Sequence, residues 1–416
     1  MADKEVTHSE EIQSEPTVKC VYCLKEKSLS AFNTTEHIIP HSCGGGGVYD
    51  ELFLTDRVCD DCNHKCGLFV DAAFLKGWSI HNDKAQSFML YADTSRIKPI
   101  PFMRFGIFEA LTSPDEACEY WSDFLGNRVY HFHENDERYS SYAGGNPINR
   151  KSKKKAGSAF LVFSENVDGE DYWITTALAS LSKFFEKESK YVLNGRITDQ
   201  SGNVLFGISG EDAETKAARI KQILDAEHKI DVSISLHAPT RFLSKISLGL
   251  GFNLLGDEFA ASKYAEDLKD ALWSYPSDRT PRLKGQTKLE MPDAHSKFMQ
   301  EIMAWPGGNS LALFRVGDQV GFFLSFYGSF IGTHPICDDI TIYNPSINID
   351  EDGVVFIWIP NREDIKAVKL SYIDLVAHKT KAKLHPDLLQ LEALRNDLDK
   401  ILPQKMKINS EKGLGK

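Results

Sequence analysis

Two cysteine pairs of identical spacing constrain this chain more than any other feature. Cys20-Val-Tyr-Cys23 and Cys59-Asp-Asp-Cys62 are both CxxC motifs, and 35 residues separate them. Each pair can place two thiolates on one tight turn, and two such turns together form a tetrahedral Zn–S4 site. A redox role is disfavoured, because thioredoxin-type chemistry needs a single CxxC that opens a helix. The spacing therefore predicts a structural Zn²⁺ bound by these four cysteines.

The distribution of the other cysteines also favours metal binding over disulfides. Six of the eight cysteines lie within the first 66 residues, whereas a disulfide framework would spread them along the chain. A module of about 50 residues needs such a staple because its own core is small. Cys43 and Cys66 have no matching spacing, so we interpret both as small packing residues. Cys66, one helical turn after Cys62, is the alternative zinc ligand.

The composition is typical of a globular protein from a reducing compartment. Hydrophobic residues make up 42% and charged residues 26% of the 416 residues, which is enough for two or three domains. The first 17 residues are polar and acidic and lack the apolar run of a secretory signal. No stretch approaches the roughly 20 apolar residues of a membrane span. We therefore expect a cytoplasmic protein that has no membrane partner.

The net charge of −11 does not by itself suggest a nucleic-acid partner. Binding depends on local patches, however, rather than on the average charge. The run RKSKKK at 150–155 carries five positive charges in six positions. Lys153, Lys154 and Lys155 are therefore candidate nucleic-acid contacts, with an ordinary solvated surface as the alternative.

Sequence patterns divide the chain into a disordered leader (1–17), a Cys/His-rich module (18–76) and a larger α+β domain (77–416). A linker-like loop suggests that the last part is split near 135–158. We predict strands at 159–163, 204–208, 231–236, 320–326 and 354–359, an amphipathic helix at 211–228, and a buried helix pair at 239–273 broken near Gly256.

A stripe of aliphatic residues near the end of the chain has helical spacing. It consists of Leu388, Leu391, Leu394, Leu398 and Ile401. Core packing is the preferred interpretation, and a contact in a homo-oligomer is the alternative.

An acid–histidine pair and an asparagine accompany the cysteine motifs. Glu36-His37-Ile-Ile-Pro lies between the two pairs, four glycines follow, and Asn63 comes directly after Cys62. The order CxxC…EHIIP…GGGG…CxxCN resembles the HNH (ββα-metal) endonuclease superfamily, in particular its zinc-stapled branch, which includes phage junction-resolving endonucleases. The resemblance covers residues 20–71, about one-eighth of the chain.

The resemblance implies a fold and a set of catalytic roles. The family's β-hairpin and helix would correspond here to strands at 34–38 and 52–55 and to a helix that begins near Cys59. His37 would be the general base that deprotonates the attacking water. Glu36 and Asn63 would bind a catalytic Mg²⁺ or Mn²⁺, because such ions prefer hard oxygen ligands. The fold class is therefore α+β, with a small zinc-stapled ββα-metal nuclease module followed by a larger mixed α+β domain.

This chain departs from the family pattern at two positions. Glu36 stands where Asp is more frequent, and the second strand lacks the Asn that orients the backbone of the catalytic histidine in many members. Thr55 or Asp56 is the candidate replacement.

Three further side chains near the predicted active site have alternative interpretations. His64 is an alternative metal ligand to Asn63. His41 is either a phosphate or metal contact or a surface histidine. Lys65 contacts either a phosphate or solvent.

These features favour a metal-dependent endonuclease that acts on nucleic acid, most simply DNA. The alternative is a zinc-stapled module that binds nucleic acid without cleaving it, or a regulatory subunit. A third possibility gives the main activity to the C-terminal region, but no nucleotide-binding or nucleophile motif supports it. In that region Arg241 and Lys245 share one helix face, which suits either a phosphate contact or, preferably, a solvated surface position.

Overall fold

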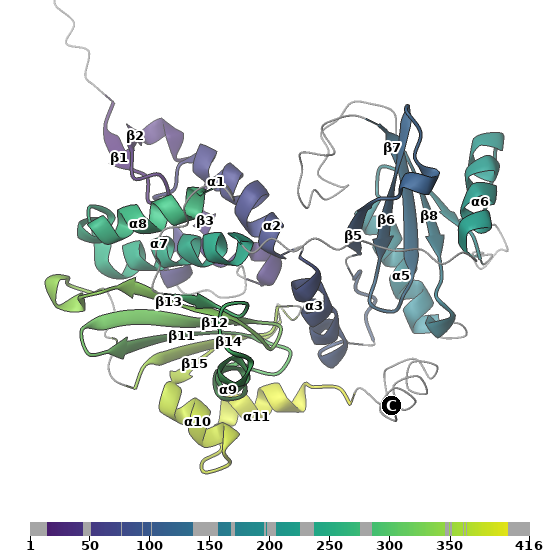
Figure 1. Cartoon of the computed structure of the whole chain (residues 1–416). Helices are drawn as coiled ribbons and strands as arrows, with labels where there is room; N and C mark the ends of the chain where they lie inside the picture. Colours follow the sequence, from purple (N-terminus) through teal and green to yellow (C-terminus); the bar gives the residue numbers. More distant parts are fainter. Residues whose placement is uncertain are drawn as a thin grey trace, which may run out of the picture.

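The computed structural model has two lobes joined through one helix, α3 (Trp78–Leu90) (Figure 1). It describes residues 15–44, 51–75, 77–93, 95–100, 102–135, 157–167, 171–194, 197, 205–224, 237–274, 285–345, 349, 352–360, 362 and 364–397. The first lobe contains the N-terminal module and the C-terminal part of the chain, and the second, the central lobe, contains the residues between them. The chain therefore leaves the first lobe after α3 and returns to it at α7 (His237–Ala260).

The N-terminal module contains the predicted hairpin and helix. Strands β1 (Thr17–Lys19) and β2 (Glu26–Ser28) pair first. Strands β3 (Glu36–His37) and β4 (Leu54–Thr55) then pair antiparallel, and α1 (Asp60–Cys66) follows. The helix continues through a π-helical turn at Gly67–Asp71 into α2 (Ala72–Leu75). The structure thus confirms the predicted order of two strands and a helix; we call β3, β4 and α1 the ββα unit.

The C-terminal part of the first lobe is a six-stranded antiparallel sheet between two layers of helices. Its strand order is β10 (Gln286–Thr287), β13 (Ser329–Cys337), β12 (Gln319–Phe326), β11 (Asn309–Val316), β14 (Val354–Trp358), β15 (Val368–Ser371). One face carries α7 and α8 (Lys263–Trp273), and the other carries α9 (Asp293–Met303), α10 (Tyr372–Lys379) and α11 (Pro386–Ala393). The strands predicted at 320–326 and 354–359 are confirmed.

The N-terminal module shares its core with this sheet. Ile38, Phe53 and Val70 belong to one continuous buried cluster with residues of α7, α8 and the sheet, such as Phe242 and Phe356. Phe53 and Phe356 meet edge to face, with 5.0 Å between ring centroids. Since apolar burial is the main source of stability, much of what holds the ββα unit comes from the distant C-terminal part of the chain.

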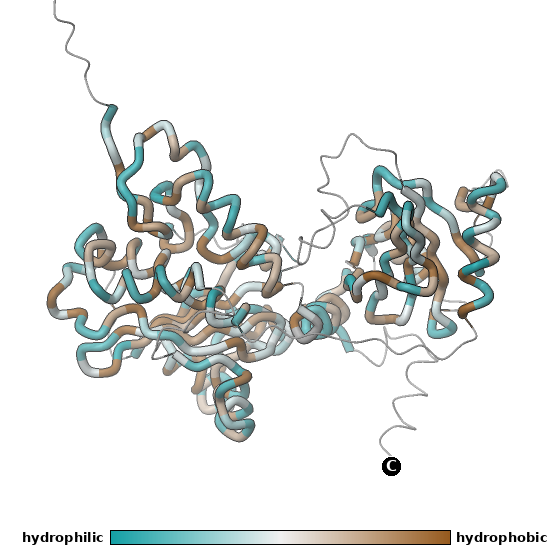
Figure 2. Tube along the Cα trace, turned by 45° about the horizontal axis from the view of Figure 1, so that its top comes forward, coloured by the Kyte–Doolittle hydropathy of each residue, from teal (hydrophilic) through white to brown (hydrophobic). Residues whose placement is uncertain are grey.

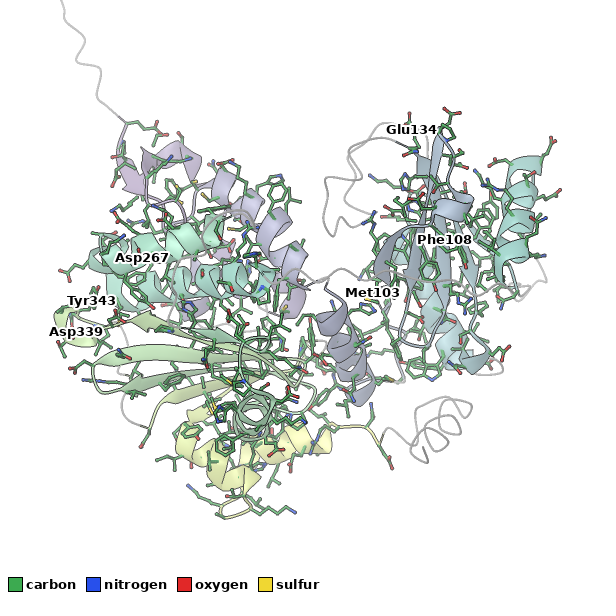
Figure 3. All side chains as sticks on the ribbon, viewed as in Figure 1. Met103, Phe108, Glu134, Asp267, Asp339 and Tyr343 are labelled. Carbon is green, nitrogen blue, oxygen red and sulfur yellow. The ribbon has the colours of Figure 1, made fainter. Side chains whose placement is uncertain are left out.

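The central lobe is a five-stranded sheet with one helix on each face. Its strand order is β5 (Met103–Ile107), β6 (Glu116–Ser122), β7 (Arg128–Glu134), β8 (Ser158–Val162), β9 (Ser189–Val192). Helix α5 (Asp171–Phe184) connects the parallel strands β8 and β9, and α6 (Glu211–Leu224) covers the opposite face. Met103 and Glu134, labelled in Figure 3, mark the start of edge strand β5 and the end of middle strand β7. Apolar residues concentrate in the strands of this sheet (Figure 2).

The segment in which we considered a domain split, near 135–158, connects two neighbouring strands of this one sheet. β7 and β8 are antiparallel partners, with Tyr130 opposite Phe160. The central lobe contains the described elements from β5 to α6, and α7 belongs to the first lobe again.

Several other predictions can be compared with the structure. The helices at 211–228 and 239–273 are present as α6 and as the pair α7–α8, and Gly256 interrupts α7 with a φ of 74°. The predicted strand at 204–208 is wrong, because the described residues 205–208 form bends and loop. Residues 231–236 lie outside the described part. Leu388, Leu391 and Leu394 pack in the core, as preferred.

No helix within the described residues is both long enough and apolar enough to cross a membrane.

Candidate functional site

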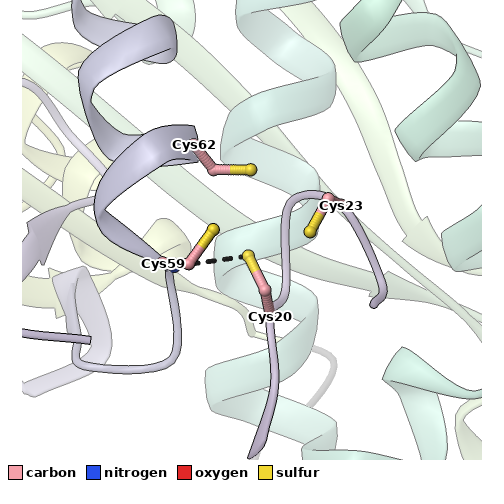
Figure 4. Close-up of side chains that lie close together, drawn as sticks. All are labelled: Cys20, Cys23, Cys59 and Cys62. Atoms are coloured by element: carbon pink, nitrogen blue, oxygen red, sulfur yellow. Dashed lines mark hydrogen bonds between the residues drawn. The ribbon is translucent and has the colours of Figure 1, made fainter. Parts of the chain in front are cut away.

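The four cysteines of the two CxxC motifs converge as predicted. Cys20 and Cys23 lie on the turn after β1, while Cys59 caps the N-terminus of α1 and Cys62 occupies its first turn. Their sulfur atoms all lie within 4.8 Å of one another (Figure 4). The backbone N–H of Cys59 donates to Cys20 Sγ over 3.3 Å, as backbone amides commonly do to zinc-bound thiolates. The four thiols therefore fit a structural zinc ion.

The electrostatics of this cluster favour a cation. Hydrogen bonding with Cys20 and Cys23, together with burial, raises the pKa of Cys62 far above the ordinary thiol range. Four thiolates this close repel one another, and a bound dication removes that repulsion. Cys43 and Cys66 are buried and lie outside the cluster of described ligands, which supports their interpretation as packing residues.

Glu36 lies on β3, opposite Thr55 of β4, and only 4% of its surface is exposed. Its Oε1 atom accepts a hydrogen bond from the Tyr22 hydroxyl over 3.2 Å and lies 2.7 Å from Lys245 Nζ. The carboxylate expected to bind the catalytic ion is thus held from one side by a buried ammonium group.

His37, the next residue on β3, is half-buried. Its ring meets that of His41 at nearly a right angle, with 5.8 Å between centroids. Burial lowers the pKa of His37, and the neighbouring His41 lowers it further. The imidazole is therefore neutral at pH 7, which is the form that a general base requires.

Asn63, on α1, is tied to the loop that precedes β3. Its Nδ2 donates to Thr34 Oγ1 over 3.0 Å, so the amide oxygen is the atom that can ligate an ion. Asp60 accepts from both Thr34 and Asn33 of the same loop. These bonds hold the first turn of α1 beside the strand that carries Glu36 and His37.

The remaining candidate residues are at the surface or outside the described part. His41 and His64 are exposed. Lys65 is exposed as well and pairs with Asp61 one turn earlier, at 2.9 Å. Lys153, Lys154 and Lys155 lie outside the described residues.

Lys245 of α7 belongs to this site, and its position differs from the one expected from the sequence. The preferred solvated position is wrong, because its side chain is fully buried and its Nζ lies 2.7 Å from Glu36 and 2.8 Å from Asp71. Burial alone would lower the pKa of Lys245, but Asp71 and Glu36 raise it above the ordinary value. Burial raises the pKa of Asp71 to about 6, although the nearby ammonium group of Lys245 acts to lower it. The signal was a single lysine in a helix segment that is otherwise apolar on nearly every face.

Lys245 also contacts the backbone of His37. In many family members an asparagine on the second strand orients this backbone, and the present chain lacks that asparagine. Here Lys245 Nζ donates to the carbonyl oxygen of His37 over 3.4 Å. The two candidates on the second strand make other contacts: Thr55 Oγ1 accepts from the Arg57 amide, and Asp56 accepts from Thr35. Lys245 thus adds a side-chain contact to the His37 backbone, which also pairs with Leu54 across the hairpin.

Comparison with known proteins identifies the same segment. Residues 20–79 match the family model described as HNH endonuclease. No curated protein and no solved structure matches the chain. The match covers the cysteine cluster, the ββα unit and the start of α3, and it supports a nuclease-type function for this module.

Proposed function

We propose, from the premise that residues 20–79 belong to the HNH endonuclease family, that this protein is a metal-dependent endonuclease hydrolysing phosphodiester bonds, with DNA as favoured substrate. The observation that carries the proposal is the arrangement of β3. A neutral, half-buried His37 directly follows the carboxylate of Glu36 on this strand. Thr34, in the loop just before the strand, accepts a hydrogen bond from Asn63 of α1. These side chains have the chemistry that hydrolysis of a phosphodiester needs.

His37 is the proposed general base. A neutral imidazole accepts a proton from the attacking water, and the lowered pKa keeps it available for that task at neutral pH. Its ring is partly accessible, unlike the buried Glu36 beside it, so water and a phosphate can reach it.

Glu36 and Asn63 are the proposed ligands of a divalent ion. Mg²⁺ or Mn²⁺ bound there would stabilise the charge that develops on the phosphate and on the leaving 3′ oxygen. Because Lys245 and Tyr22 engage Glu36 Oε1, the second carboxylate oxygen is the donor toward the ion. The Asn63 amide oxygen is the other.

Lys245 is the proposed positioning residue of this site. By contacting both Glu36 Oε1 and the His37 carbonyl, it fixes the ligand and the base relative to each other. Its own charge remains compensated because Asp71 supplies a second carboxylate at 2.8 Å.

One observation favours a second candidate function, a module that binds nucleic acid without cleaving it. The ammonium group of Lys245 already neutralises Glu36, and a cation bound by the same carboxylate would be repelled by it. In that case the zinc cluster and the ββα unit would serve recognition alone.

Cleavage of supercoiled plasmid by the full-length protein tests the proposal. We expect nicking or linearisation with Mg²⁺ or Mn²⁺ and none with EDTA. His37→Ala should abolish cleavage at unchanged zinc content, and His295→Ala, which alters an exposed histidine on α9, should have no effect.

Binding of labelled DNA in EDTA separates the two candidate functions. Folded, zinc-loaded wild-type protein that binds DNA but cleaves no DNA or RNA with either ion would establish the binding module instead.

A further inference from the structure

The central lobe buries a second group of metal-binding side chains, far from the cysteine cluster. Glu119 of β6 and His131 of β7 are direct cross-strand partners, and His133 follows on the same face of β7. They are 1%, 0% and 4% exposed. One ligand atom of each lies within 4.8 Å of the others. Glu188, in the turn between α5 and β9, adds a second carboxylate.

The distances within this group are unusual for hydrogen bonds. His131 Nδ1 lies 3.4 Å from Glu119 Oε2, His131 Nε2 lies 3.4 Å from Glu188 Oε1, and His133 Nε2 lies 3.5 Å from Glu119 Oε1. A charge-assisted hydrogen bond would shorten them to about 2.8 Å. Two ligands at about 2.0–2.1 Å from a tetrahedral ion are separated by about 3.4 Å. The separations of His131 Nδ1 and His133 Nε2 from the Glu119 carboxylate therefore match ligand–ligand distances around one ion, whereas His131 Nε2, on the other side of the ring, faces Glu188.

Two buried polar atoms lie on the other side of the His131 ring. Within the described part of the chain, His131 Nε2 and Glu188 Oε2 have no hydrogen-bond partner of good geometry. A buried polar atom without a partner costs about 1–3 kcal/mol, and more when the group is charged. When His131 Nδ1 binds a cation, the ring proton is on Nε2, where the Glu188 carboxylate can accept it.

The tautomer of His133 leads to the same conclusion. Its Nδ1 lies 2.8 Å from the carbonyl oxygen of Glu134, which can only accept, so Nδ1 carries the proton. In the neutral ring Nε2 is then an acceptor, and it lies 3.5 Å from Glu119 Oε1, which is also an acceptor. Two acceptors this close repel each other unless a cation or a proton lies between them. A ligating histidine typically donates its other nitrogen to a backbone carbonyl in this way.

The outer contacts hold Glu119 in a fixed orientation. Arg104 donates to its Oε1 through Nε over 3.0 Å, and the Trp121 indole donates to its Oε2 over 3.2 Å. Each carboxylate oxygen has two lone pairs, so these bonds leave acceptor capacity for an ion. Such second contacts commonly orient the ligands of a metal site.

We infer that Glu119, His131 and His133 bind a divalent transition-metal ion of the zinc type, and that Glu188 orients His131 through the other ring nitrogen. Two imidazoles and one carboxylate suit zinc and its neighbours rather than Mg²⁺. The site is closed, since His131 and His133 are almost inaccessible, so its role is structural. It joins β6 and β7 to the end of α5, where Phe185 packs on His131 with 5.3 Å between ring centroids. The inference does not depend on the nuclease proposal.

Metal analysis of the intact protein tests the inference. The full-length chain carries His37→Ala and Asn63→Ala, so that an ion at the nuclease site is not counted, and is loaded with Zn²⁺ and dialysed. We expect two zinc ions per chain, and X-ray absorption at the zinc edge should show nitrogen and oxygen neighbours besides sulfur. One ion per chain with sulfur neighbours only would overturn the inference, and would leave a metal-free network in which His131 is protonated between two carboxylates.

Variants then assign the second ion. His131→Asn with His133→Asn should reduce the content to one zinc with sulfur neighbours. His334→Asn, which alters a buried histidine in the other sheet, should retain both ions. Retention of two ions by the double variant would also overturn the assignment. If the double variant does not fold, the absorption spectrum of the parent protein still decides.

Discussion

The two ends of the ββα unit are held by very different means. At one end, four cysteines from a short stretch of chain, Cys20 to Cys62, surround the zinc site. At the other end, side chains of α7 reach into the unit from about 200 positions away in the sequence. Lys245 contacts Glu36 and the His37 carbonyl, and Asn253 donates to the carbonyls of Leu52 and Leu54.

The difference shows what spacing in a sequence can and cannot reveal. A metal cluster built from local turns has a fixed spacing, because four ligands must meet at one ion. An anchor supplied by a distant helix has no spacing rule, since the fold alone brings it near. The module matched by the HNH family model therefore shares its core with the C-terminal sheet and its helices, in addition to carrying its own cysteine cluster.

Substitution of a cysteine in the cluster should have the largest effect on the stability of the ββα unit. Cys23→Ala should release the zinc ion and unfold the turns it joins, because structural zinc contributes on the order of 10 kcal/mol to folding of such modules. Metal content and amide hydrogen exchange across 17–66 measure this. Cys66→Ala is the matched control, since Cys66 lies in the same helix but outside the cluster. Equal zinc loss in both variants would mean that the ligand set is different.

Substitution of Lys245, at the α7 end of the unit, should cause the second largest loss of stability. Lys245→Met leaves Glu36 and Asp71 buried without their cation, and loss of one partner of a buried ion pair costs about 3–5 kcal/mol. Urea denaturation should detect this loss, with zinc content unchanged. Adding Glu36→Gln and Asp71→Asn should restore much of the stability, because no unpaired charge then remains. A Lys245→Met protein as stable as the wild type would contradict the buried triad.

Acid should weaken the packing of α7 on the sheet. Burial lowers the pKa of His334 from 6.5 to about 4, and its Nδ1 lies 2.7 Å from Ser247 Oγ of α7. Between these pH values the unfolded chain binds a proton that the folded chain does not, so stability falls as pH falls from 6.5 to 4. The loss attributable to this group is about 3 kcal/mol.

The comparison of wild type with His334→Gln isolates this contribution, since zinc loss in acid affects both proteins equally. The wild type should lose more stability than the variant over this pH range in denaturation experiments. Parallel stability profiles would show that His334 has no part in the acid response.

The smallest effect is expected at Asn253. Asn253→Ala removes the donor to the carbonyls of Leu52 and Leu54, which should cost about 1–3 kcal/mol. Faster amide exchange at 51–55, with unchanged exchange around the cysteines, would locate the effect. Unchanged exchange at 51–55 would mean that Asn253 does not anchor this strand.

The sequence was informative where function requires local spacing. The CxxC pairs predicted a cysteine cluster that the structure confirms, and the hairpin and helix lie where the family resemblance indicated. The metal identities and catalytic roles of Glu36, His37 and Asn63 stay predictions.

The rest depends on tertiary structure that periodicity does not encode. Lys245 has the composition of a surface residue, and only the packing of α7 against the ββα unit buries it. His131 and His133 alternate along a strand, but their meeting with Glu119 requires the pairing of β6 with β7. The insertion of the central lobe before α7 likewise follows from the fold.

In the proposed nuclease, strand β3, which carries Glu36 and His37, needs its α7 anchor as well as the cysteine cluster. The most direct test is the single-turnover rate of plasmid cleavage by Lys245→Met at a zinc occupancy equal to the wild type, under conditions where both proteins are folded. We expect a loss of at least tenfold, because Glu36 and the backbone of His37 lose their common contact. Cleavage at the wild-type rate would contradict it.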